Sequence, residues 1–136
     1  MKNLLLAAVC TAALSGCAAN QAARQAQIDL FNKTIPHCKA PAECDAMWEA
    51  AQVWISMNGQ MKIQNVTNVL IDTYNSPPNS PTLAMKATKM PSGNGSYRIV
   101  FEGGCNNMFG CIPTVWEAGV RFNDYVNTAG AVQPAS

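Results

Sequence analysis

The stretch LAMKATKMPSGNGSYRIVFE, residues 83–102, decides the fold. Each half alternates apolar with polar side chains, which is the pattern of a β-strand that buries one face. The side chains expected to share the buried face are Leu83, Met85, Ala87, Tyr97, Ile99 and Phe101. Between the halves, residues 91–95 read Pro-Ser-Gly-Asn-Gly, a run of turn formers. Two alternating runs around such a turn predict a β-hairpin, with its second strand ending at Gly103-Gly104.

A further strand is expected before the hairpin. Residues 69–75 are rich in β-branched and aromatic side chains, which favour strands. Upstream, the alternation slips over residues 65–68, which indicates a bulge or a turn. Residues 75–81 contain three prolines and therefore predict a loop.

Residues 41–57 have the spacing of an amphipathic helix. Their apolar positions include Cys44, Met47, Trp48, Ala51 and Ile55. Pro suits a first helical turn, and Asn58-Gly59 supplies a stop. We expect this helix to bury that face, with Trp54 to one side at the core or its rim.

A closing helix is expected over residues 114–127. Thr114 and Glu117 have the spacing of a capping box. Apolar or small residues then recur at helical intervals. Residues 129–136 are small and polar, and we expect a flexible tail there.

These elements predict an α+β domain over residues 34–128, preceded by a possible helix within 17–33. The expected architecture is an antiparallel sheet of three or four strands packed by helices on one face, in the order helix, helix, strands, helix. This order is similar to that of the TolA and TonB C-terminal domains. Order of elements alone carries that similarity, so it implies a fold and no activity.

The N-terminus has the layout of an export signal. Met1-Lys2-Asn3 is a short positive start, and residues 4–13 form an apolar run that is too short to span a bilayer. The run leads into Leu14-Ser15-Gly16-Cys17, which resembles the lipobox of bacterial lipoproteins.

The resemblance implies cleavage of a signal peptide, residues 1–16, and fatty acylation of Cys17. Inner-membrane lipoproteins usually carry Asp after the cysteine, whereas this chain has Ala18, so the implied address is the periplasmic side of the outer membrane. Residues 17–33 would then be a lipidated tether, with its first half a mobile spacer. The alternative is an ordinary secretory signal cut within residues 18–20, which would leave a soluble periplasmic protein.

Composition constrains the remaining 120 of the 136 residues to one domain and a tether. Lys2 leaves with the signal, so eight of the nine Lys and Arg remain beside eight Asp and Glu. A neutral chain without charge runs argues against a nucleic-acid partner.

The cysteines predict two disulfides. Without Cys10 and the acylated Cys17, four remain, and an even number in an exported domain indicates bridges. They form two clusters with the same gap, so of three connectivities we favour the local pairs Cys38–Cys44 and Cys105–Cys111. A bridge between clusters remains open, because Cys44 lies on the buried face of its helix.

No residue pattern predicts catalysis. The one histidine, His37, is flanked by a cysteine expected to be oxidised, and the spacing fits no standard zinc site. The carboxylates are scattered through separate elements. We therefore expect no enzyme, no metal and no cofactor besides the covalent lipid.

The loop over residues 105–111 is the candidate partner-binding element. Its candidate residues are Asn106, Asn107, Met108 and Phe109. A loop pinned by a disulfide loses little entropy on binding. The alternative, and the simpler expectation, is that Met108 or Phe109 folds inward and fills the core.

The expected function of the protein is that of a binding or envelope-assembly accessory for a protein or cell-wall partner. The alternatives are a hydrolase inhibitor displayed on the envelope and a small periplasmic enzyme.

Overall fold

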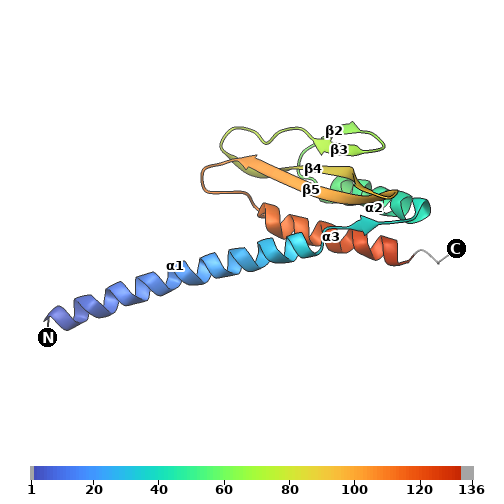
Figure 1. Cartoon of the computed structure of the whole chain (residues 1–136). Coiled ribbons are helices and arrows are strands. Elements are labelled where there is room, and N and C mark those ends of the chain that lie inside the picture. Colours follow the sequence, from blue (N-terminus) through green and yellow to red (C-terminus); the bar gives the residue numbers. More distant parts are fainter. Residues whose placement is uncertain (1, 133–136) are drawn as a thin grey trace.

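The chain is an α+β protein, described for residues 2–132 by a computed structural model (Figure 1). Side chains are described from residue 16 onward. In chain order the elements are α1 (Lys2–Lys33), β1 (His37–Cys38), α2 (Pro41–Asn58), β2 (Ile63–Val66), β3 (Leu70–Thr73), β4 (Ser80–Gly93), β5 (Ser96–Asn106) and α3 (Val115–Ala131). The strands form one antiparallel sheet in the order β1-β5-β4-β3-β2.

The hairpin of β4 and β5 is the centre of the sheet, as predicted. Its turn contains Asn94 at φ 53° and Gly95 at φ 73°, the positive angles that a tight hairpin turn requires. Both strands are longer than predicted. Gly103 and Gly104 pair with Met85 and Ala84, because backbone pairing continues where side chains no longer alternate.

The sheet has five strands, so the prediction of three or four was wrong, and the predicted element order was also wrong. β1 lies between the first two helices and pairs with β5, His37 opposite Arg98. A strand of two residues carries no periodic pattern, which is why the sequence did not predict it. The predicted irregularity at 65–68 is the turn between β2 and β3, with a bulge between Ile63 and Asn65.

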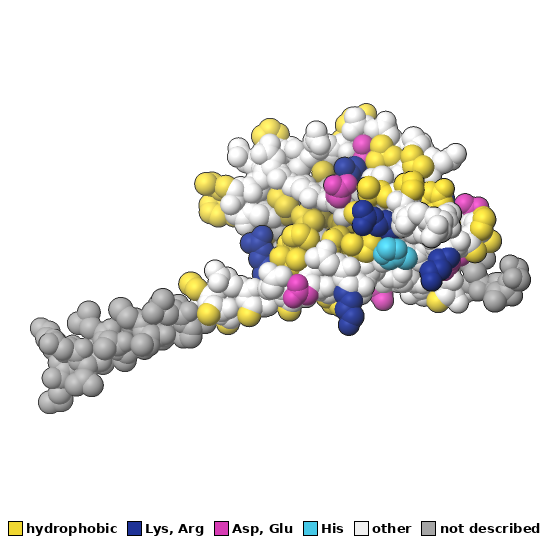
Figure 2. Space-filling model, in the orientation of Figure 1, with side chains coloured by type: hydrophobic (Ala, Val, Ile, Leu, Met, Phe, Trp, Pro, Cys, Tyr) yellow, Lys and Arg dark blue, Asp and Glu magenta, His cyan; other side chains and the backbone are white. Residues whose placement is uncertain are grey.

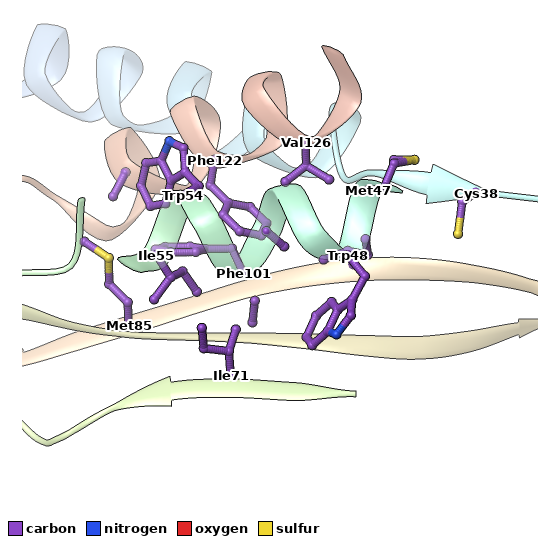
Figure 3. Close-up of a cluster of buried hydrophobic side chains, with 14 of the residues drawn as sticks. Cys38, Met47, Trp48, Trp54, Ile55, Ile71, Met85, Phe101, Phe122 and Val126 are labelled. Atoms are coloured by element: carbon purple, nitrogen blue, oxygen red, sulfur yellow. The ribbon is translucent and has the colours of Figure 1, made fainter. Parts of the chain in front are cut away.

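The core lies between the sheet and the two helices α2 and α3 (Figure 3). The predicted buried face of α2 is confirmed. Trp54 belongs to the core itself, since only 7% of it is exposed. Its ring meets Phe101 and Phe122 edge-on, with centroids 5.8 and 5.5 Å away. This aromatic group joins both helices to β5.

α1 is helical over residues 2–33 and leaves the domain at one end (Figure 1). A helix therefore replaces the spacer expected for the first half of residues 17–33, consistent with an alanine- and glutamine-rich sequence. Its last turns dock on α3, where Phe31 packs edge-on against Trp116 at 5.6 Å. Among the described residues, no helix combines the length and hydropathy needed to cross a membrane.

α3 begins as predicted and ends later than predicted. The hydroxyl of Thr114 accepts a hydrogen bond from the Glu117 amide, which confirms the cap. The helix continues to Ala131, so the first part of the predicted tail is helical. Residues 133–136 of that tail lie outside the described residues.

Candidate functional site

Both predicted local disulfides are present. Cys38–Cys44 and Cys105–Cys111 have Cα–Cα distances of 5.1 and 5.5 Å. The first links β1 to the start of α2, so a buried Cys44 is compatible with a local bridge. The second closes the loop between β5 and α3.

The tip of the 105–111 loop projects into solvent, so the expected inward packing was wrong. Met108 is 91% exposed and Phe109 is 93% exposed. Ile112, just after the bridge, is 70% exposed. We call Met108, Phe109 and Ile112 the apolar tip.

Local hydrogen bonds explain why the tip points outward. The Asn107 side-chain amide donates to the carbonyl of Asn79 at 3.0 Å, which ties the loop to the β3–β4 loop. The Asn107 side-chain oxygen accepts from the Phe109 amide at 2.8 Å. The Ile112 amide donates to the Pro81 carbonyl at 2.9 Å. The loop is thus a fixed platform whose apolar side chains have no place in the core.

A shallow groove of about 520 Å³ separates this loop from α1. The α1 side of the groove is lined by Asn20, Ala23, Arg24 and Gln27. The other side is lined by Phe109 to Cys111 and the start of α3. The candidate binding residues therefore lie beside the first turns after Cys17, which is exposed and forms no disulfide.

A second hollow, of about 550 Å³, lies on the face of the sheet that the helices leave open. Its polar lining includes Gln64, Asp72, Asn75, Ser76, Lys86 and Glu102. Ala84 and Gly104 pair across β4 and β5 and leave room between the larger side chains. The alternation of β4 and β5 placed Lys86 and Glu102 on the polar face, but only the sheet register brings Asp72 beside them.

The charged groups of this hollow already have partners. Lys86 Nζ lies 2.7 Å from a Glu102 carboxylate oxygen. Asp72 accepts hydrogen bonds from the backbone and side chain of Asn65 at 3.0 and 2.8 Å. His37 is remote from them, because its partner Arg98 is four residues from Glu102 along β5, about 13 Å at 3.3 Å per residue. Among the residues described, no three His, Cys, Asp or Glu are grouped to hold a metal ion.

No family model, curated protein or solved structure matches this chain. The functional interpretation therefore depends on the geometry of the chain itself.

Proposed function

We propose that the chain is a lipoprotein of the outer membrane, anchored at Cys17, that acts as a binding or assembly accessory in the periplasm and not as an enzyme. The lipobox-like residues 14–17 and the export-like segment before them support the anchor. The two disulfides agree with an oxidising compartment.

The observation that carries the proposal is the exposure of the apolar tip on a fixed loop. Single exposed apolar side chains are common, but a group of them, such as Met108, Phe109 and Ile112, is typical of a contact site. The disulfide and the Asn107 hydrogen bonds hold that loop before any partner arrives, so little entropy is lost on contact.

Fractionation of cells tests the anchor. We expect the wild-type chain in the outer-membrane fraction and the Cys17→Ser variant out of it. Cys10→Ser is the matched control, since it removes a signal-peptide cysteine and should leave membrane attachment unchanged. Equal membrane recovery of Cys17→Ser and the wild type would refute the anchor.

A pull-down from detergent-solubilised envelopes tests the accessory function. We expect the acylated chain to recover a specific protein or cell-wall partner, and the Phe109→Ala variant tests whether the apolar tip makes that contact. The matched control is Val66→Ala, which truncates an exposed apolar side chain on β2. Recovery that is identical for both variants would exclude the loop as the contact.

A hydrolase inhibitor is the second candidate, because that function requires a protruding loop. In that case the purified chain would inhibit a secreted hydrolase, and Asn107→Ala, Met108→Ala or Phe109→Ala would abolish inhibition.

A further inference from the structure

We propose that the apolar tip enters the same lipid surface in which Cys17 is anchored. This proposal rests on the proposed lipid anchor and names the partner of the loop. The tip would give the domain a second attachment point. The domain would then have one orientation on the membrane instead of rotating freely about α1.

The geometry of α1 brings the anchor and the tip together. Asn20, Arg24 and Gln27 line the groove against the loop, and Cys17 precedes Asn20 by three residues on the same helical face. Three residues of α-helix span about 4.5 Å. An acyl chain on Cys17 and the side chain of Phe109 would therefore reach one surface from the same side of the molecule.

The charge distribution favours a lipid surface. Three stretches form this end of the molecule: residues 17–28 of α1, residues 74–85 around the β3–β4 loop, and residues 103–116 around the disulfide loop. None of them contains Asp or Glu, and their one charged residue is Arg24. Figure 2 shows apolar side chains over both loops at the left end of the domain.

Three carboxylates directly flank these stretches: Asp29, Glu102 and Glu117. Glu102 is paired with Lys86 and Glu117 with Arg121, while Asp29 accepts a hydrogen bond from the Gln25 side chain. Phospholipid headgroups carry negative charge in part, so three stretches that combine apolar side chains, one arginine and no carboxylate suit them. A surface that binds a protein has no comparable reason to lack Asp and Glu.

The backbone amide groups of the loop are already hydrogen-bonded within the protein, as a less polar environment requires. The amide groups of Phe109, Gly110 and Ile112 donate to oxygen atoms within the protein. Unpaired amides are costly away from water, so their internal pairing lowers the cost of insertion.

Oxidation of methionine in the wild-type chain tests the proposal without any substitution. The acylated protein is reconstituted in vesicles of phosphatidylethanolamine and phosphatidylglycerol, treated with hydrogen peroxide and mapped by mass spectrometry. Detergent-solubilised protein is the reference. We expect Met108 to oxidise several-fold more slowly on vesicles, while Met90, which is exposed near the opposite end of β4, keeps its rate.

Quenching of tryptophan fluorescence by brominated lipids gives a second measurement. Phe109→Trp should be quenched beyond the wild-type level, whereas the control Val66→Trp, on an exposed site of β2, should match the wild type. Phe109 makes no core contact that the change would remove, because its side chain is almost fully exposed.

The outcomes separate this proposal from the proposed function. Flotation of the acylated protein with vesicles, without protection of Met108 or extra quenching at position 109, would overturn the lipid contact and leave the anchor intact. Failure of the protein to float would refute both. Protection of Met108 in whole envelopes but not on vesicles would assign the tip to a protein and overturn the lipid contact.

Discussion

Asn123 shows how single residues join α1 to the domain. Its side chain is fully buried on α3 and donates to the Phe31 carbonyl at 3.0 Å and to the Thr34 hydroxyl at 3.2 Å. The Phe31 carbonyl also accepts from the Thr34 amide at 3.3 Å, so Asn123 adds a second donor at the end of α1. A polar side chain in the core thus helps to fix the direction in which α1 leaves the domain.

Asn123→Ala should therefore lower the free energy of unfolding by about 1 kcal/mol, because two hydrogen bonds of a buried amide group are lost. The loss should be no larger, because the Phe31 carbonyl keeps the Thr34 amide as a donor and the buried Asn123 Oδ1 has no partner to lose. Asn127→Ala is the matched control. Asn127 also donates to Thr34, at 2.8 Å, but it is exposed, so water can replace it at little cost. Urea denaturation measures both, and equal losses would contradict the importance that we assign to the buried contact.

Position 119 requires a residue without a side chain. A Cβ there would lie 2.6 Å from two atoms of the Phe31 ring, at the contact between α1 and α3. Gly119→Ala should lower thermal stability and loosen α1, which limited proteolysis near residue 34 would detect. Gly130→Ala is the control on the same helix, because its Cβ would meet the flexible end of Met47. Faster cleavage of Gly130→Ala than of Gly119→Ala would contradict this explanation.

At the scale of elements, periodic segments could be predicted from sequence and brief ones could not. α2 and the central hairpin have long apolar patterns, so their existence and buried faces were predictable. β1 is held by two residue pairs with β5, which only the folded sheet supplies.

The candidate site was predictable in part. The cysteine spacing predicted both disulfides. The orientation of Met108 and Phe109 was not predictable, because it depends on a hydrogen bond from Asn107 to the Asn79 carbonyl, 28 residues away in the sequence. The polar hollow was missed because it depends on the register of three strands.

Removal of the Cys105–Cys111 bridge tests the loop as an element. The double change Cys105→Ser and Cys111→Ser opens a short loop, so the loss of stability should be about 2 kcal/mol. The lipid protection of Met108 should fall much more, since the tip is no longer fixed. The control is the Cys38→Ser and Cys44→Ser double change, at the junction of β1 and α2. It should cost more stability, because both residues are buried in the core, and should still leave Met108 protected. Loss of protection in both would mean that the loop does not depend on its own bridge.

At the scale of the whole molecule, the chain has two different ends. The end formed by residues 17–28 of α1 and the apolar tip has Arg24 as its one charged residue, whereas the acidic residues lie further along the helices and on the open sheet face. If that end contacts a membrane as proposed, the open face with its polar hollow remains accessible from the periplasm. In this arrangement the proposed anchor at Cys17 and the fold together determine how the domain is oriented on the membrane and which of its faces a periplasmic partner can reach.

A charge at the tip should disturb this arrangement. Phe109→Glu should leave the fold intact, because the side chain is exposed, and should raise the oxidation rate of Met108 on vesicles to its rate in detergent. Val66→Glu provides an equal change of charge on β2 and should not affect Met108. An unchanged Met108 rate in Phe109→Glu would contradict the insertion of the tip.

The most direct test of the central claim is the intact mass of the chain extracted from the outer membrane of a Gram-negative host. We expect the mass of residues 17–136 plus a diacylglyceryl group and further acylation at the N-terminus, with fragmentation placing the lipid on Cys17. An unmodified chain that begins within residues 18–20, or one that retains residues 1–16, would contradict the anchor and the orientation built on it.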